Sequence, residues 1–371
     1  MMKVMLDQMI LTTCCPTNAG SKMLENFTSP FAATVVEKLA AKGFAIGDEN
    51  GCKAPVGEFA IDLVGETSFA GAADTAASLK NDTASAIVTL DVNGAPRRIA
   101  AQQGLVFAKP TYGIVSRYGT VPVACSGECV GVMAKTVADC REVLSAIVGK
   151  DERDGTMHAD EVCRAAVANA DTAKKVAVLK MEGSDSAEMA AAKAELAANG
   201  IEIAEINAGV IAGANAAWNM LMCAELCNNV SRYDGVKYGY RTKNYKNLDE
   251  LYTNSRTEAF GLTLKTAILY GSDVLSTKNY MAKYDKAMRV RRVISEAFAA
   301  IFAEFDAVLM PAVSKMNYTA EDCAFAENKY TAPAQMAGLP AVVAAGVQVM
   351  GPAFSDGKLL ALAALLAKEG K

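Results

Sequence analysis

Hydrophobic residues along the chain recur at two spacings, one typical of amphipathic helices and the other of buried strands. In TVVEKLAA (residues 34–41) the apolar residues fall at helical spacing, and Gly43 is of the residue type that most often follows a helix end. The short apolar run Phe44-Ala45-Ile46 then indicates a buried strand. This order predicts a helix that packs beside a strand.

The clearest unit lies in the middle of the chain. KVAVLK (residues 175–180) predicts a strand, residues 186–199 an alanine-rich helix ended by Gly200, and residues 201–206 a second strand. Two strands joined by a helix form a βαβ unit. Other apolar segments predict helices over 72–86, 136–148, 212–230, 279–304 and 358–367, and strands over 87–90, 104–108, 305–310, 341–345 and 347–350. The pattern predicts an α/β fold with a mixed or mainly parallel sheet.

Composition narrows the class of protein without identifying it. Of 371 residues, 52% are hydrophobic and 21% are charged, which is typical of a soluble globular protein. The net charge of −4 excludes a generally basic surface, so any RNA contact would come from a local patch. Residues 1–10 lack the apolar core of a secretory signal, and we find no run of transmembrane length. We therefore expect a cytoplasmic protein that does not contact membranes.

The ten cysteines show no disulfide-framework rhythm, and in a reducing cytoplasm we expect them to be small core residues. Cys14 and Cys15 are adjacent, which suits neither a tetrahedral zinc site nor an easy disulfide. Two further pairs have spacings that could share a helical face: Cys125 with Cys129, and Cys223 with Cys227. Zinc needs four ligands, and the single histidine, His158, lies in a polar stretch typical of a surface loop. The sequence predicts no metal site and no cofactor.

One stretch combines a strand with a turn that suits anion binding. TLDVNGAPRRIAAQQGLVFAKPTYGIVSRYG (residues 89–119) continues the apolar run 87–90 into a turn through Asp91 and Gly94. A strand that leads into a glycine turn can point backbone N–H groups at one place and so stabilise an oxyanion. By pattern alone this signal is weak, because many α/β proteins contain such a turn.

This stretch resembles the amidase signature family, most closely the A subunits of glutamyl-tRNA(Gln) and aspartyl-tRNA(Asn) amidotransferases. The resemblance rests on GLVFAKPTYGIVSRYG (104–119) and on these blocks: TNAGSKMLENFTSPFAATVVEKLAAKGFAIG (17–47), AKTVADCREVLSAIVGKDERDGT (134–156), SRYDGVKYGYRTKN (231–244), SRTEAFG (255–261), YMAKYDKAMRVRRVI (280–294), FDAVLMPA (305–312) and TAPAQMAGLPAVV (331–343). It implies a mixed, twisted sheet covered on both sides by helices. It also implies a single domain over residues 1–371, with 160–260 as a candidate subdomain or cap. Compared with the family, the chain looks trimmed at its N-terminus and between residues 48 and 70.

The resemblance also indicates where catalytic groups should lie. Active members cut an amide with a Ser–Ser–Lys relay; the corresponding positions here hold Ala95 for the nucleophile, Gly71 for the bridging serine and Asp48 for the lysine. Alanine and glycine carry no hydroxyl, and a carboxylate cannot replace an amine with a lowered pKa. We therefore expect a truncated, catalytically degenerate pseudoenzyme. The remnant of its oxyanion turn is expected at Asp91, Asn93 and Gly94.

Positions that hold the substrate glutamine in active relatives correspond here to Trp218, Ala267 and Asn328. Recognition of an α-amino acid needs one cation and one anion to pair its two charged groups. None of these three residues is charged. The resemblance therefore implies that glutamine binding of this kind is lost as well.

A separate candidate site is the segment RYDGVKYGYRTKNYK (residues 232–246), which interleaves tyrosines with basic residues. Aromatic rings can stack on bases, and cations can hold phosphates. Interleaved charge is more often a solvated loop, and an acidic pair follows at residues 249–250. The residues that would contact RNA are Lys237, Tyr238, Arg241 and Lys243.

Three functions fit these observations. The leading hypothesis is an A-subunit-like protein without amidase activity of its own, a structural or regulatory partner of the B and C subunits of a tRNA-dependent amidotransferase or of an intact A subunit. The second is a working component of a glutamyl-tRNA(Gln) amidotransferase, in which a partner supplies the missing groups or Ser68 or Lys53 is repositioned. The third is an RNA-binding module built on residues 232–246.

Overall fold

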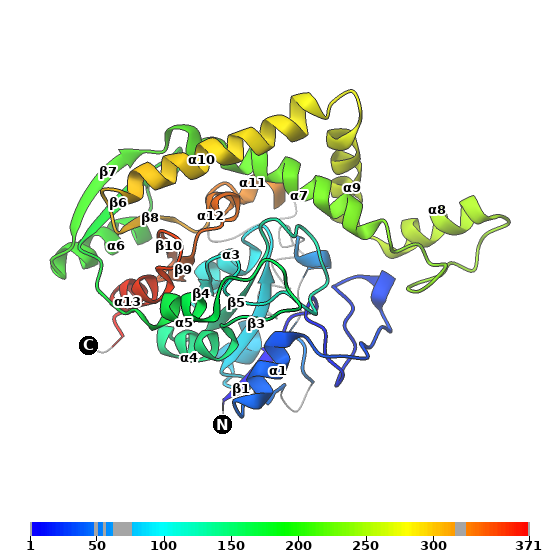
Figure 1. Cartoon of the computed structure of the whole chain (residues 1–371), viewed down its shortest axis with the longest axis horizontal. Coiled ribbons are helices and arrows are strands. Elements are labelled where there is room, and N and C mark those ends of the chain that lie inside the picture. The colour runs from blue at the N-terminus through cyan, green and yellow to red at the C-terminus, as the bar shows by residue number, and fades with distance from the viewer. Residues whose placement is uncertain (1, 48–50, 55–56, 62–75, 316–323, 370–371) are drawn as a thin grey trace.

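The structure is a computed structural model, and it describes the chain except for residues 1, 48–50, 55–56, 62–75, 316–323 and 370–371. Among the described residues, ten strands form one sheet, with helices packed on both faces (Figure 1). The strands are β1 Lys3–Leu6, β2 Ala45–Ile46, β3 Ala86–Asp91, β4 Val106–Lys109, β5 Cys129–Ala134, β6 Lys175–Lys180, β7 Glu202–Asn207, β8 Ala307–Pro311, β9 Ala341–Ala344 and β10 Val347–Met350.

The sheet is mixed, as the sequence predicts. Its strand order is β2-β1-β3-β5-β4-β9-β10-β8-β6-β7. At one end β1 runs parallel to β2 and β3, and at the other β6 runs parallel to β7 and β8. The pairings between these two ends are antiparallel. The predicted βαβ unit is confirmed as β6, α6 and β7, and it forms one edge of the sheet.

Two apolar cores lie on opposite faces of the sheet, because successive side chains of a strand point to opposite sides. Ile87 and Phe107 face the core that includes α3, whereas Val88 and Ala108 face the larger core with α1, α4 and α13. The helices are α1 Thr34–Ala41, α3 Ala95–Gln103, α4 Val137–Ile147, α5 Asp160–Ala168, α6 Ala187–Ala198, α7 Ala214–Val230, α8 Leu248–Ala259, α9 Leu262–Leu275, α10 Lys286–Phe302, α11 Ala324–Glu327, α12 Ala332–Ala337 and α13 Asp356–Leu366.

Most predicted elements are confirmed, and their ends follow the expected caps. The side chain of Thr136 accepts the N–H of Asp139 at the start of α4, as its position before the helix suggests. One predicted helix is too long. The helix predicted over 72–86 ends in its described part at residue 80, where a turn follows and leads into β3 at Ala86. Helix α3 was not predicted: it contains the polar pair Arg97 and Arg98, which the structure buries together with the rest of residues 95–101.

One apolar segment, Gly209–Val230, is long and apolar enough to cross a membrane by length and composition. We expected no run of this length from the sequence, so that expectation is corrected here. The most apolar window of the segment is 56% buried within the protein, and α7 packs against α9, α10 and α12. These contacts are those of a core helix.

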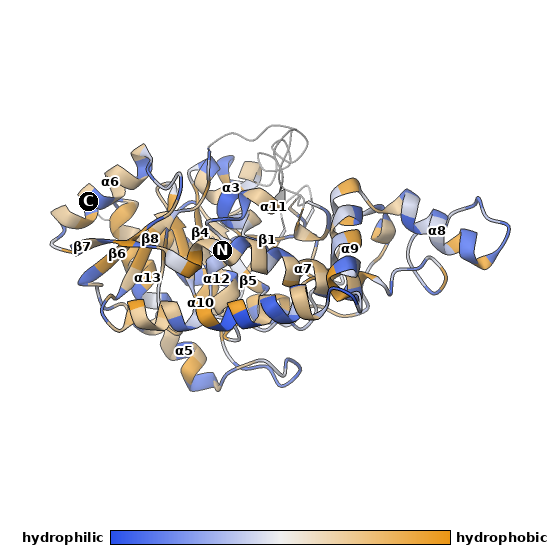
Figure 2. Cartoon of the chain, turned by 90° about the horizontal axis from the view of Figure 1, so that it is seen from above, coloured by the Kyte–Doolittle hydropathy of each residue, from blue (hydrophilic) through white to orange (hydrophobic). Residues whose placement is uncertain are grey.

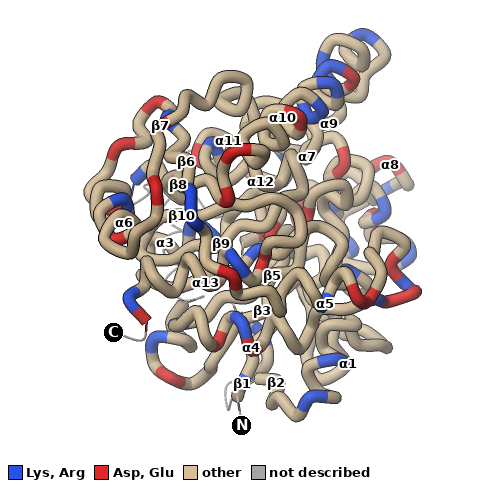
Figure 3. The backbone as a smooth tube through the Cα atoms, turned by 60° about the vertical axis from the view of Figure 1, so that its left-hand side comes forward, with Lys and Arg blue, Asp and Glu red and all other residues tan. Residues whose placement is uncertain are grey.

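Helix α8 lies at the far end of the molecule from α6 and β7 in two perpendicular views (Figures 1 and 2). Its outer part is hydrophilic (Figure 2). Along the rest of the chain, basic and acidic residues are interspersed in the view of Figure 3. This distribution agrees with a protein of small net charge.

Candidate functional site

The turn between β3 and α3 is built around a glycine that no other residue could replace without strain. Gly94 has a φ of +84° and forms the N-terminal boundary of α3. A Cβ atom at this position would lie 2.1 Å from the Cβ of Thr331. Both the left-handed backbone and the close approach of α12 therefore require glycine.

A buried ion pair holds this turn against the sheet. The Asp91 carboxylate accepts the Gly94 N–H at 2.8 Å and pairs with the Arg97 Nε at 2.8 Å, and both charged side chains are fully buried. Arg97 also donates to the side-chain oxygens of Gln335 and Gln348. A buried ion pair is stable only when its remaining hydrogen-bonding groups are satisfied, as they are here. The network thus joins α3, α12 and β10.

At Ala95 the turn presents a methyl group, and its backbone donor is already in use. The Ala95 N–H donates to the Oδ1 atom of Asn93 at 3.2 Å, and Ala95 itself is fully buried. The Gly94 N–H is likewise engaged by Asp91. A substrate oxyanion would have to displace these side chains before either N–H group could stabilise it.

The Asn93 side chain is part of the hydrogen-bond network of the turn. Its side chain is fully buried and also donates to the carbonyl oxygen of Ile61 at 3.4 Å. Its own carbonyl oxygen accepts from Arg98 at 2.8 Å and from the Thr331 hydroxyl at 2.9 Å. The three expected remnants of the oxyanion turn, Asp91, Asn93 and Gly94, therefore lie together, but Asp91 binds Gly94 and Asn93 binds the backbone of Ala95.

Two of the three predicted substrate positions adjoin this turn. The Trp218 indole N–H donates to the Val92 carbonyl oxygen at 3.1 Å, and its ring is fully buried. The Asn328 carbonyl oxygen accepts the hydroxyl of Thr331, which also bonds the turn, and its amide donates to Asn219 at 2.7 Å. Ala267 is buried in α9, which packs against α7.

Comparison with known proteins identifies the family of this chain. Residues 86–360 match the family model described as Amidase. The chain belongs to the amidase family. The A subunit of the glutamyl-tRNA(Gln) amidotransferase from Nitrosococcus oceani is 34% identical over 95% of this chain and 80% of its own length. Its counterpart from Latilactobacillus sakei is 34% identical over 96% of this chain and 80% of its own length.

A solved structure shows the same architecture. The A subunit of the glutamyl-tRNA(Gln) amidotransferase of Thermotoga maritima matches with a TM-score of 0.78 and 27% identity, over 99% of this chain and 83% of that one. The predicted amidase-signature fold, with its mixed sheet and flanking helices, is confirmed. The chain spans about four fifths of the length of the relatives it matches.

Two of the positions that the amidase resemblance assigns to the relay, Asp48 and Gly71, lie outside the described residues. Ser68, a candidate to replace a missing hydroxyl, also lies outside them. Of the three relay positions, Ala95 is the one within the described residues.

Sequence reasoning missed a buried acid beside the turn. Asp7 directly follows β1 and accepts the N–H groups of Met9 and Leu90, both at 2.6 Å, and the hydroxyl of Thr89 at 2.7 Å. Burial raises the pKa of Asp7, and these three hydrogen bonds act against that rise. The only signal in the sequence was one acidic residue directly after the apolar run of residues 4–6, which alone does not identify a site.

Lys53, the candidate replacement base, lies beside Asp7. Its ammonium donates to the backbone carbonyl oxygen of Asp7 at 2.9 Å and to that of Ile10. Burial lowers the pKa of Lys53 to about 8, while Asp7 opposes the shift. A lysine of this kind could act as a base near neutral pH, but residues 91–95 of the turn carry no hydroxyl for it to activate.

The predicted RNA segment lies between α7 and α8 and is largely exposed. Its four candidate residues, Lys237, Tyr238, Arg241 and Lys243, are all exposed. The Arg241 guanidinium lies over the ring of Tyr245, 5.6 Å from its centroid. A hollow of about 360 Å³ is lined in part by Phe27, Tyr233 and Tyr238.

The cysteines differ from expectation at two points. Cys15 and Cys52 form a disulfide, although we expected reduced thiols. Cys14 is exposed, and Cys125 and Cys227 are partly exposed, although we expected core residues. Four other cysteines are buried as predicted: Cys129, Cys140, Cys163 and Cys223. Cys129 lies in β5, so the pair with Cys125 does not share a helix, whereas Cys223 and Cys227 both lie in α7. His158 is exposed, as expected.

Proposed function

We propose that this amidase-family chain does not hydrolyse amides on its own and acts as a structural or regulatory subunit of a tRNA-dependent amidotransferase. The observation that carries the proposal is Ala95, which occupies the position assigned by resemblance to the nucleophilic serine. Without a nucleophile no acyl-enzyme can form, and the loss of one relay member usually lowers the rate by orders of magnitude. The occupied N–H groups of the turn support the same conclusion.

The substrate positions support the proposal independently. Trp218, Ala267 and Asn328 are uncharged and buried, and the Trp218 ring packs so closely on Gly127 that a Cβ there would lie 2.3 Å from it. None of the three could pair with the carboxylate or the ammonium of a free amino acid. Asp48 and Gly71, assigned by resemblance alone, would remove the base and the bridging hydroxyl.

Exposed apolar side chains on α9 and at the start of the helical segment Met281–Asp285 support a role as a partner. Leu262, Leu269 and Met281 are 81%, 73% and 65% exposed. Leu262 and Leu269 are seven residues apart and so share one face of the helix. Contiguous exposed apolar patches on a soluble protein commonly mark an interface, and we propose that these side chains form such a patch. We propose that it binds a B or C subunit, or an intact A subunit, in the cytoplasm, with residues 1–371 acting as one domain.

Reconstitution with B- and C-type subunits tests this function. We expect the chain to co-purify with at least one of them, and we expect Leu262→Asp with Leu269→Asp to abolish the association. The matched control is Val162→Asp, which changes an apolar residue that is 37% exposed on α5. The reconstituted complex should amidate misacylated tRNA with ammonium but not with glutamine as nitrogen donor. Glutamine-dependent amidation would overturn the proposal and favour a working amidotransferase component.

The exposed segment 232–246 is our candidate for tRNA contact within such a complex. Changing Lys237, Arg241 and Lys243 to alanine should weaken tRNA binding about tenfold and reduce its dependence on salt concentration, because three phosphate contacts are lost. An electrophoretic shift assay at two salt concentrations measures both effects. Alanine at Lys42, Arg164 and Arg292, exposed basic residues elsewhere, is the control. Equal losses in both triple variants would contradict a specific contact.

A further inference from the structure

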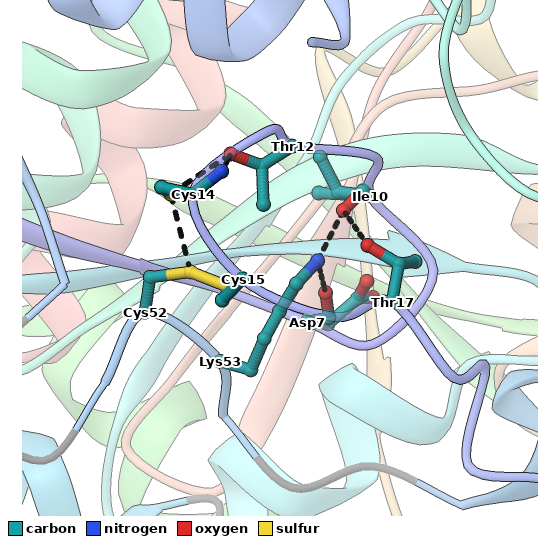
Figure 4. The surroundings of a disulfide bond; sticks show 8 residues. All are labelled: Asp7, Ile10, Thr12, Cys14, Cys15, Thr17, Cys52 and Lys53. Atoms are coloured by element: carbon teal, nitrogen blue, oxygen red, sulfur yellow. Dashed lines mark hydrogen bonds between the residues drawn. A yellow bond between two sulfur atoms is a disulfide. The ribbon is translucent and has the colours of Figure 1, made fainter. Parts of the chain in front are cut away.

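Three cysteine sulfur atoms gather beyond the end of β1. The Sγ atoms of Cys14, Cys15 and Cys52 lie within 4.8 Å of one another (Figure 4). Cys15 and Cys52 are joined as a disulfide with a Cα–Cα distance of 6.6 Å, and Cys14 is free. The Cys14 Sγ lies 3.5 Å from the Cys52 Sγ, which places a free thiol in contact with the disulfide.

The solvent exposure of the three cysteines differs in a way that suits stepwise thiol–disulfide exchange. Cys14 is exposed, Cys15 is half-buried and Cys52 is only 6% exposed. A reagent from solution therefore meets Cys14 first, whereas Cys52 is accessible mainly through its neighbours. Thiol–disulfide exchange depends on access to the attacked sulfur as well as on the attacking thiolate.

We propose that these cysteines form a thiol–disulfide exchange site, in which Cys14 transfers oxidation or reduction between low-molecular-weight thiols and the Cys15–Cys52 pair. The site is separate from the turn at Ala95, and the contacts among its three sulfur atoms are independent of the proposed function. With the pair oxidised, Cys14 is the one free thiol of the three, too few for the four-ligand sites typical of structural zinc.

The exchange begins from the reduced site and a low-molecular-weight disulfide. The Cys14 thiolate attacks that disulfide, forms a mixed disulfide and releases one thiolate. The Cys52 thiolate then attacks the Cys14 sulfur, so that a Cys14–Cys52 bond forms and the second small thiolate leaves. Finally the Cys15 thiolate attacks Cys52, which yields Cys15–Cys52 and returns Cys14 to a thiolate. Two electrons pass from the protein to the small disulfide, and reduction follows the same steps in reverse.

A polar group lies beside Cys14. The Thr12 hydroxyl is 3.0 Å from the Cys14 Sγ. The thiolate is the form of a cysteine that attacks a disulfide. Figure 4 shows Lys53 beside the disulfide, with its ammonium directed at the carbonyl oxygens of Asp7 and Ile10.

The disulfide ties the Cys14–Cys15 loop to a segment that pairs with β1. The Leu6 N–H donates to the Cys52 carbonyl oxygen at 3.0 Å, and the Ala54 N–H donates to the Leu6 carbonyl oxygen at 2.7 Å. Reduction would remove this covalent link between the loop and the segment around Cys52. In a reducing compartment disulfides are usually transient, catalytic or redox-sensing, and this step alone rests on the proposed cytoplasmic location.

Disulfide mapping in glutathione buffers tests the exchange. The full-length protein and its variants are equilibrated with reduced or oxidised glutathione, quenched by alkylation at timed intervals and analysed by peptide mass spectrometry. In Cys15→Ser, oxidised glutathione should produce a Cys14–Cys52 disulfide. In Cys14→Ser, the Cys15–Cys52 bond should still form, but its formation and reduction should slow by about tenfold or more, because direct attack must reach less accessible sulfurs.

Cys227→Ser, which alters a partly exposed thiol on α7, is the matched control and should leave both rates unchanged. Thermal unfolding of each variant shows whether it remains folded. The proposal is overturned if Cys14→Ser exchanges at the wild-type rate, or if a folded Cys15→Ser protein forms no Cys14–Cys52 bond.

Discussion

The loop after β1 and the turn after β3 leave the sheet side by side, yet they differ in chemical character. β1 and β3 are parallel neighbours, with Leu6 paired to Val88. At the end of β3 the polar groups of the turn bind one another around a methyl group. At the end of β1 lie a buried carboxyl, a lysine with a lowered pKa and an exposed thiol touching a disulfide. The loop after β1 and the turn after β3 occupy equivalent positions in the fold, so their side chains determine which of them can react.

The largest effect should come from breaking the ion pair under the turn. Asp91→Ala leaves Arg97 buried without its anion, which we expect to destabilise the protein by about 3–5 kcal/mol. Chemical denaturation measures the free energy of unfolding. The control is Glu296→Ala, which removes an exposed partner of Arg292 and should change stability by about 0.5 kcal/mol or less. Similar stabilities of the two variants would show that the turn does not depend on this pair.

A test on the β1 side uses the lowered pKa of Lys53. The pKa of this lysine has its ordinary value of 10.5 in the unfolded chain and is lowered to about 8 in the folded protein. Between these values the unfolded state binds more protons, so Lys53 makes folding more favourable as the pH rises. Relative to Lys53→Met, the wild type should therefore gain about 2–3 kcal/mol between pH 8 and 10.5. A constant difference across this range would refute the shifted pKa.

A comparison of Gly94 with Gly104 separates the cost of a steric clash from the cost of backbone strain, because both residues have a positive φ. Gly94 and Gly104 both have positive φ, but a Cβ at Gly94 would collide with Thr331, whereas one at Gly104 would meet nothing within 4 Å. Gly104→Ala should cost about 1 kcal/mol, from backbone strain alone. Gly94→Ala should cost about 2 kcal/mol more, since α12 must also move. Thermal or chemical unfolding measures both, and equal losses would mean that the turn is less closed than we infer.

Sequence reasoning succeeded where local pattern decides structure. The Thr136 cap and the βαβ unit depend on residues close together in the chain. The position of the turn was also predictable, because a strand, an aspartate and a glycine follow one another. That Asn93 would turn inward and occupy the Ala95 N–H was not, since this depends on Ile61, Arg98 and Thr331 around it.

The region after β1 was less predictable for a physical reason. Cys15 and Cys52 are 37 residues apart, and they meet because the segment around Cys52 pairs with β1. Asp7 and Lys53 likewise come together through this pairing. Helix α3 was missed because the burial of its polar pair, Arg97 and Arg98, depends on partners far along the chain such as Gln348 and Thr331.

The most direct test is whether the purified chain releases ammonia from glutamine, asparagine or simple amides, measured beside a heat-inactivated sample and a catalytically active relative. We expect no release above the heat-inactivated control, because Ala95 offers no nucleophile and the N–H groups of its turn are occupied. Ammonia release that co-purifies with the chain and disappears in Lys53→Met would contradict this, and would place a working catalytic site beside β1.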